Sequence, residues 1–326
     1  MLVLVAPGQG SQTPGFLTPW LDLPGAADRL RGWSEVIGLD LLRFGTEADA
    51  EEIRDTAVAQ PLLVASALLS AEYLLADAPA DPGAAPAPLA PNRPGPAPDV
   101  VAGHSVGELA AAALAGVLSP EDALRLVRRR GLAMAEAAAV TATGMSAVLG
   151  GDPEQVADHL ERLGLTAANA NGAGQVVAAG TLEQLAALAG DRPERARVIP
   201  LKVAGAFHTA HMAPAVEAMA TAAGELEPAD PVLTWVSNAD GEPVTSGKEV
   251  LERLVSQVSN PVRWDLCTDT FLRMGVDALI ELCPGGTLTG LAKRAMKGVR
   301  TVAVKTPADL AGAREVLTEH SGGGDR

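Results

Sequence analysis

Apolar residues fall into short runs that alternate with longer stretches of helical or alanine-rich pattern. The runs lie at residues 2–6, 99–102, 145–149, 175–179, 198–203, 232–237 and 277–282. Short buried strands separated by helices are typical of proteins whose strands pair in parallel. The pattern therefore predicts an α/β fold with a largely parallel sheet.

Residues 141–200 have the pattern of a separate, smaller unit. It contains two strand–helix repeats with short connections, with strands at 145–149 and 175–179 and helices at 153–163 and 181–190. This order fits a small ferredoxin-like subdomain inserted into the larger one. After residue 200 we expect the chain to return to the main sheet.

The remaining residues, 1–140 and 201–310, are expected to form the large subdomain. Residues 77–98 interrupt it with eight prolines, together with alanine and glycine and without any period. We interpret them as a flexible surface insertion between a helix ending near Leu75 and the next strand, and not as an interdomain linker. Residues 311–326 are expected to form a C-terminal tail, with its glycine-rich end disordered.

A glycine-flanked serine stands where a strand meets a helix. Gly103-His104-Ser105-Val106-Gly107 follows one of the apolar runs and precedes a helical pattern at 108–118. This is the G-x-S-x-G pattern of a nucleophile elbow, which predicts an α/β-hydrolase-like large subdomain. Glycines allow the sharp turn, and the helix N-terminus offers N–H groups to an oxyanion. The alternative is a Gly-Ser turn without chemistry.

A serine nucleophile needs a base, and the chain has five histidines. Three are poor candidates because of their positions. His320 lies in the predicted tail, and His159 lies on a polar helix face. His104 lies in the elbow itself, where its side chain should point away from the serine.

The remaining two, His208 and His211, follow the run at 198–203, and loops after strands often hold catalytic groups in α/β enzymes. We choose His208, because it precedes the helical segment 210–223; the alternative is a pair of surface or capping histidines. A metal site would need a third ligand and a nearby acid that this His-x-x-His pattern lacks, so we predict none.

One arginine is predicted to point inward from a long helix. Ser119-Pro120-Glu121-Asp122 reads as a helix start, and the helix after it buries a stripe that includes Leu124, Val127 and Met134. At about 100° per residue, Arg125 and Arg129 fall opposite that stripe, whereas Arg130 falls at its edge. An inward guanidinium needs an anionic partner. Spacing alone leaves open whether that partner is a ligand or a structural acid.

Composition limits the class of partner. The net charge of −15 argues against nucleic acid or an anionic membrane. We expect no apolar stretch long enough to span a bilayer, and the run at 2–6 lacks a basic leader. Cys267 and Cys283 form neither a disulfide framework nor a zinc spacing. We expect a cytoplasmic enzyme.

Several motifs occur together, in order, over nearly the whole chain. They are Pro7-Gly8-Gln9-Gly10-Ser11-Gln12, Gln60-Pro61, Gly103-His104-Ser105-Val106-Gly107-Glu108, Arg130-Gly131 with Met134, Asn169 ahead of Gly174-Gln175-Val176-Val177, Gly205-Ala206-Phe207-His208, Gln257 with Asn260-Pro261-Val262-Arg263-Trp264, and Leu288-Thr289-Gly290-Leu291. This set resembles the malonyl-CoA:acyl-carrier-protein transacylases of fatty acid and polyketide synthesis.

The resemblance implies an acyltransferase that moves a malonyl group from malonyl-CoA to the phosphopantetheine thiol of acyl carrier protein through a serine ester. It implies no bound cofactor, and we expect a monomer whose partners are the carrier protein and the coenzyme A thioester. The pathway, fatty acid or polyketide synthesis, stays open.

The resemblance also implies a role for each site residue. Ser105 would be the nucleophile, His208 the base, and Arg130 the group that binds the malonyl carboxylate. The backbone N–H groups of Gln9 and Val106 would stabilise the oxyanion, and the backbone carbonyl of Gln257 would orient the histidine. Asn169 would line the cleft, and Phe207 would select malonyl over methylmalonyl. Phe207 could instead simply pack beneath the histidine loop.

Two other functions are weighed against this one. A serine thioesterase or hydrolase acting on dicarboxylic acyl thioesters would share the elbow, and release of free malonate would distinguish it. A non-catalytic subunit that binds the carrier would need a broken Ser–His pair, whereas Ser105 and His208 are both present.

Overall fold

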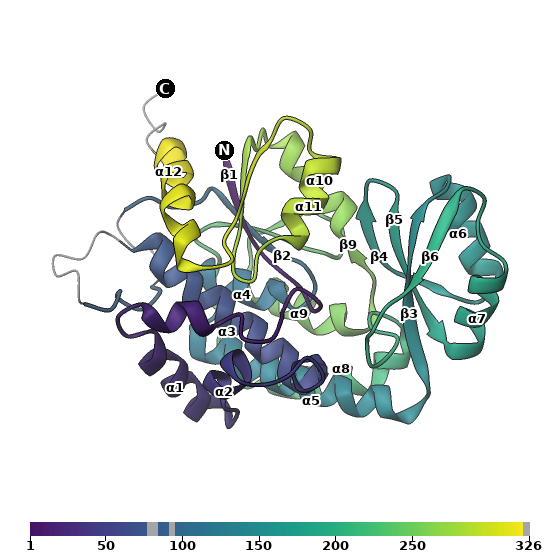
Figure 1. The fold of residues 1–326 in the computed structure, drawn as a ribbon, viewed down its shortest axis with the longest axis horizontal. Coiled ribbons are helices and arrows are strands. Elements are labelled where there is room, and N and C mark those ends of the chain that lie inside the picture. Colours follow the sequence, from purple (N-terminus) through teal and green to yellow (C-terminus); the bar gives the residue numbers. More distant parts are fainter. Residues whose placement is uncertain (77–83, 91–94, 322–326) are drawn as a thin grey trace.

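The structure is a computed structural model that describes residues 1–76, 84–90 and 95–321. It has a larger and a smaller lobe side by side (Figure 1). Part of the predicted insertion at 77–98 lies outside the described residues; its described portions, 84–90 and 95–98, have no helix or strand. The last five residues of the predicted tail, 322–326, also lie outside them.

A six-stranded sheet forms the centre of the large lobe. Its order is β11 (Arg300–Ala303), β10 (Ala278–Glu281), β1 (Leu2–Ala6), β2 (Val100–Gly103), β7 (Thr234–Val236) and β8 (Pro243–Val244). All neighbours pair in parallel except β7 and β8. The strand β1 is apolar and buried throughout, as expected where helices cover both faces of a parallel sheet. The predicted parallel α/β architecture is confirmed.

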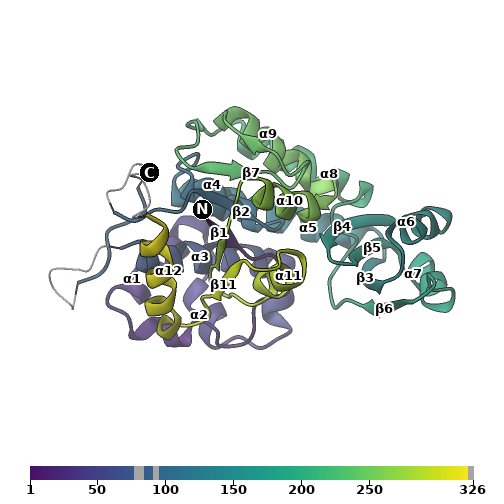
Figure 2. The same cartoon turned by 90° about the horizontal axis from the view of Figure 1, so that it is seen from above.

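Helices lie on both sides of this sheet (Figure 2). Alternate residues of β1 feed two cores: Leu2 and Leu4 join the larger one, whereas Val3 and Val5 join the smaller one. The α-helices of the large lobe are α1 (Ala26–Ile37), α2 (Leu41–Thr46), α3 (Thr56–Leu75), α4 (Gly107–Leu114), α5 (Pro120–Val140), α8 (Ala213–Ala223), α9 (Gly247–Ser256), α10 (Trp264–Arg273), α11 (Thr287–Ala295) and α12 (Leu310–Ser321). Short 3-10 helices are η1 (Thr18–Asp22), η2 (Glu52–Arg54), η3 (Ala210–Met212), η4 (Gln257–Ser259) and η5 (Pro307–Asp309).

The helix α3 corrects one expectation from the sequence. Among the described residues it alone is long and apolar enough to cross a membrane by length and composition, although we expected no such stretch. Inside the protein, 94% of this apolar window is buried. A helix that is apolar all round belongs in a core, and α3 is the central helix of this one.

The small lobe has the ferredoxin-like order βαββαβ. Its elements are β3 (Thr143–Gly150), α6 (Pro153–Arg162), β4 (Thr166–Gly172), β5 (Gln175–Thr181), α7 (Leu182–Gly190) and β6 (Ala196–Pro200). The sheet order is β6-β3-β5-β4, and β9 (Val262–Arg263) extends it beside β4. The predicted ferredoxin-like fold is confirmed, although β4 was not predicted, because its sequence has no apolar run.

Two predicted segments differ from the structure. The small unit was given two strands, at 145–149 and 175–179, but β6, which lies within its predicted bounds of 141–200, also belongs to it, because it pairs antiparallel with β3. Most of the segment 311–326 is the helix α12 and not a tail. Its Ala313, Val316 and Leu317 recur at helical spacing and are buried in the larger core, which holds the helix in place.

Candidate active site

The serine at the elbow occupies a tight, strained turn between β2 and α4. Ser105 has a φ of 55°, in the left-handed region that non-glycine residues rarely adopt. A Cβ on Gly103 would lie 1.9 Å from the carbonyl carbon of Gly107, and a Cβ on Gly107 would lie 2.3 Å from the carbonyl oxygen of Ala6. Only glycine fits at both positions. The turn therefore presents Ser105 at the N-terminus of α4.

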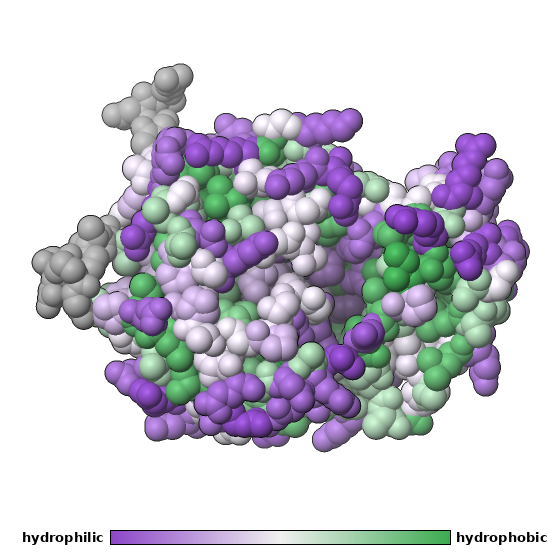
Figure 3. Space-filling view, in the orientation of Figure 1, coloured by the Kyte–Doolittle hydropathy of each residue, from purple (hydrophilic) through white to green (hydrophobic). Residues whose placement is uncertain are grey.

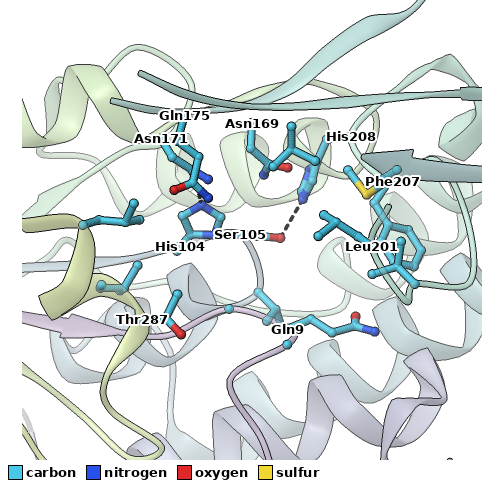
Figure 4. A pocket seen from close by; sticks show the side chains of 18 of the residues that line it. Gln9, His104, Ser105, Asn169, Asn171, Gln175, Leu201, Phe207, His208 and Thr287 are labelled. Carbon is cyan, nitrogen blue, oxygen red and sulfur yellow. Dashed lines mark hydrogen bonds between the residues drawn. The ribbon is translucent and has the colours of Figure 1, made fainter. Parts of the chain in front are cut away.

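His208 meets Ser105 from the loop between β6 and η3. Its Nε2 lies 2.7 Å from the serine Oγ, and its Nδ1 lies 2.9 Å from the backbone carbonyl oxygen of Gln257 (Figure 4). A carbonyl can only accept, so Nδ1 carries the proton and Nε2 is free to accept from the serine. Burial, followed by the charge of Arg130, lowers the pKa of His208 to about 3. The imidazole is therefore neutral and can act as a base.

Arg130 lies beside this pair and is 1% exposed. Its Nη2 donates to the side-chain oxygen of Gln257 at 3.0 Å and to the Oγ of Ser105 at 3.3 Å. Its Nη1 has no hydrogen-bond partner, and the guanidinium forms no direct ion pair, within the part of the chain that the structure describes. Burial lowers its pKa to about 10, which still leaves it charged at neutral pH. The site thus holds a buried cation with donor capacity left over.

Two backbone N–H groups complete the polar surroundings of Ser105. Gln9 follows β1, and Val106 follows the serine; both line the same cavity. Neither N–H donates a hydrogen bond within the described residues. A Cβ on Gly8 would lie 2.8 Å from the carbonyl oxygen of His104, so this glycine lets the two loops pack closely. Free N–H groups beside a nucleophile can stabilise an oxyanion.

A cavity of about 460 Å³ opens over Ser105 between the two lobes. The space-filling view shows the hollow between them (Figure 3). The large lobe contributes Gln9, Gln60 and Leu288, and the small lobe contributes Asn169, Asn171 and Val177. Phe207 lines the cavity beside His208. The volume and the mixed apolar and polar lining suit the end of an acyl thioester.

A family model described as "Acyl transferase domain" matches residues 3–315. The chain belongs to the acyl transferase family. It is 54% identical to the malonyl CoA-acyl carrier protein transacylase of Mycobacterium tuberculosis strain ATCC 25618 / H37Rv over 310 residues, which cover 95% of this chain and 98% of that one. The sequence-based resemblance is confirmed, and the protein is an acyltransferase.

Solved structures agree with this assignment. The crystal structure of MCAT from Mycobacterium tuberculosis matches this acyltransferase with a TM-score of 0.87 and 51% identity, covering 96% of this chain and 99% of that one. A malonyl-transacylase in complex with its type II PKS acyl-carrier protein matches with a TM-score of 0.84 and 30% identity, covering 97% and 99%.

The structure of the acyltransferase brings together all eight residues predicted from the sequence. Six of them line the cavity: Gln9, Ser105, Val106, Asn169, Phe207 and His208. The other two, Arg130 and Gln257, are buried and do not line the cavity, but they bond to one another and to the Ser–His pair. Arg125 and Arg129 are exposed on α5, as the helical spacing predicted.

Two residues of this acyltransferase site were missed in the sequence. Asn238, just after β7, accepts the N–H of Ser105 at 2.8 Å and donates to the carbonyl of Gly103 at 2.8 Å. Glu108 accepts the N–H of Asn238 at 2.6 Å and also bonds to the side chain of Gln257. An acid within the otherwise apolar α4 was a usable signal for Glu108. Asn238 gave none, because its partners come from a distant strand.

The other histidines of the acyltransferase have structural partners or lie away from the serine. His104 points away from Ser105, as predicted, but also lines the cavity, and its Nε2 lies 2.9 Å from Oδ1 of Asn171 (Figure 4). His159 was assigned to a polar face but is buried, with Nε2 2.7 Å from the carbonyl of Asp191. His320 lies on α12 and not in a tail, 3.1 Å from Asp277. His211 is on η3 and does not line the cavity.

No group of three or more His, Cys, Asp or Glu side chains in the described parts of the acyltransferase could hold a metal ion. Both cysteines are free and buried, and burial raises the pKa of each thiol. Neither thiol has the lowered pKa of a nucleophilic cysteine. Ser105 is therefore the residue on which the chemistry has to be tested.

Proposed function

We propose that this acyltransferase moves a malonyl group from malonyl-CoA to the phosphopantetheine thiol of acyl carrier protein, in a ping-pong reaction through an ester on Ser105. The observation that carries the proposal is the Ser105–His208 contact of 2.7 Å beside the buried Arg130, whose guanidinium has no ion-pair partner among the described residues. The names of the relatives support the same substrates.

In the first half-reaction, the Oγ of Ser105 attacks the thioester carbonyl while Nε2 of His208 takes the hydroxyl proton. The backbone N–H groups of Gln9 and Val106 stabilise the oxyanion. The carbon–sulfur bond then breaks, and the coenzyme A sulfur leaves with the proton returned by His208. The malonyl group remains as an ester on Ser105, with its free carboxylate bound by Arg130.

In the second half-reaction, the carrier's thiol enters the same cavity after coenzyme A has left. His208 takes the thiol proton, and the sulfur attacks the ester carbonyl. When the tetrahedral intermediate collapses, the ester bond breaks and Ser105 regains the proton from His208. The product is malonyl carrier protein, an extender unit for fatty acid or polyketide synthesis in the cytoplasm.

Mass spectrometry of the intact protein tests this proposal. After brief exposure to malonyl-CoA, we expect a mass increase of one malonyl group. The increase should disappear in Ser105→Ala and remain in Ser256→Ala, which removes an exposed serine hydroxyl on α9. An adduct that persists in Ser105→Ala would place the nucleophile elsewhere.

A second measurement separates transfer from hydrolysis. The isolated malonyl enzyme is divided between buffer and buffer containing the phosphopantetheinylated carrier. We expect the ester to persist in buffer and to pass to the carrier when the carrier is present. Rapid release of free malonate without the carrier would favour the hydrolase instead.

A further inference from the structure

A buried acid, Glu108, lies at the start of α4 beneath the nucleophile turn. Its side chain is 1% exposed, and both carboxylate oxygens accept N–H bonds. It touches neither the cavity nor Ser105 through its side chain, and the proposed reaction does not use it. Burying a carboxylate is costly unless it is fully hydrogen-bonded, so this acid needs an explanation.

Glu108 connects to the catalytic groups along two branches. Through Asn238, whose backbone N–H it accepts, it supports the elbow: the amide of Asn238 bonds to the N–H of Ser105 and to the carbonyl of Gly103. Through Gln257, whose Nε2 donates to the acid, it reaches the second branch. The amide oxygen of Gln257 accepts from Arg130, and its backbone carbonyl accepts from His208.

The direction of these bonds follows from the acid. An oxygen of the carboxyl group accepts from Nε2 of Gln257, which keeps the NH₂ of that amide toward the acid and its oxygen toward Arg130, a group that can only donate. The reversed amide would place its NH₂ against the guanidinium, with two donors facing each other. The carboxylate therefore determines which end of Gln257 the arginine meets.

The acidity of Glu108 depends on the same neighbours. Burial raises the pKa of this carboxyl to about 8, whereas the hydrogen bond from the N–H of Asn238 and the positive charge of Arg130 lower it. The amide of Gln257 stands between this carboxyl and Arg130, so the acid reaches the guanidinium through one residue and not through a direct ion pair.

We infer that Glu108 is a positioning residue for malonyl transfer: through Gln257 it orients the guanidinium of Arg130 for the acyl carboxylate. This inference rests on the proposed function. It does not make Glu108 a catalytic residue, since the acid acts through Gln257 and Asn238. It assigns to α4, as well as to α5, a part in selecting dicarboxylic acyl groups.

The test compares malonyl-CoA with acetyl-CoA as donors to the carrier. In Glu108→Gln, one donor–donor conflict arises whichever way the new amide turns, at Asn238 or at Gln257. We expect kcat/KM for malonyl-CoA to fall by about 10- to 100-fold, the effect of one lost charge-assisted hydrogen bond, with most of the change in KM. Acetyl transfer, which needs no carboxylate contact, should fall less. Glu136→Gln, an exposed acid on α5, is the control.

A double variant, Glu108→Gln with Gln257→Glu, separates orientation from folding. It restores the sequence of donors and acceptors, but places a carboxylate directly against Arg130. We expect it to fold and to recover acetyl transfer, while malonyl transfer stays low because the new carboxylate occupies the guanidinium. If Glu108→Gln does not fold, the double variant alone still gives the malonyl-to-acetyl ratio.

An unchanged malonyl-to-acetyl ratio in Glu108→Gln, or full recovery of malonyl transfer in the double variant, would overturn the inference. These results are distinct from failure of the proposed function. If the native protein forms no malonyl adduct on Ser105, the proposed function fails. If the native adduct forms and the ratio is insensitive to position 108, only the role of Glu108 fails.

Discussion

Replacing Arg130 with alanine should remove malonyl transfer selectively. The guanidinium lies 3.3 Å from the Oγ of Ser105, has an unpartnered Nη1 and forms no direct ion pair among the described residues. A malonyl carboxylate on Ser105 could accept from it in the bidentate manner typical of arginine. A hydrogen bond to a charged group contributes about 1.5–3 kcal/mol, so kcat/KM for malonyl-CoA should fall by about 10- to 100-fold.

Competition between malonyl-CoA and acetyl-CoA measures this effect. Acetyl has no second carboxylate, so its transfer by Arg130→Ala should hold or rise. Arg130→Lys keeps the charge but not the two-pronged donor, and should lie between the native enzyme and Arg130→Ala. The control is Arg129→Ala, which removes an exposed arginine from the same helix and should change little.

An equal loss of both activities in Arg130→Ala would refute the reasoning, because it would make the arginine a structural residue. The thermal unfolding midpoint of each variant has to be measured alongside, since Arg130 is buried and its loss removes hydrogen bonds to Ser105 and Gln257. A native-like midpoint with equal losses would be the clearest contradiction.

Three further predictions concern Phe207 and His208, the neighbours of Ser105 in the cavity. Phe207 is 6% exposed and lines the cavity beside His208, so we expect the native enzyme to prefer malonyl-CoA to methylmalonyl-CoA. In competition kinetics, Phe207→Ser should reduce that preference. An unchanged preference would show that another residue causes it. The pKa of His208 is lowered to about 3 from its ordinary 6.5, so the rate of malonyl adduct formation should not decline as pH falls from 8 to 5. A decline centred near pH 6.5 would contradict this, because it would show that the base titrates like an exposed histidine. Because the unfolded chain binds the proton first, the stability contributed by the neutral imidazole is full above pH 6.5 and is lost as pH falls from 6.5 toward 3.

Local spacing was sufficient for the elements whose shape depends on neighbouring residues. The glycines around Ser105 predicted the elbow because the absence of a Cβ matters within the turn itself. Ser119 caps α5 as predicted, with its hydroxyl accepting the N–H of Asp122. The inward direction of Arg130 followed from the helical repeat alone, because a stripe of apolar side chains determines the direction in which each remaining residue of the helix points.

Tertiary structure decided what depends on partners far apart in the chain. The run at 198–203 could have joined either sheet, and its pairing with β3 placed it in the small lobe. The sequence predicted that His159 lies on a polar helix face, whereas the fold buries it against the backbone carbonyl of Asp191. The connection from Glu108 through Gln257 to Arg130 joins residues 149 and 127 positions apart. Hydrogen bonds at such separations leave no periodic trace in a sequence, since each partner is positioned by a different helix or strand.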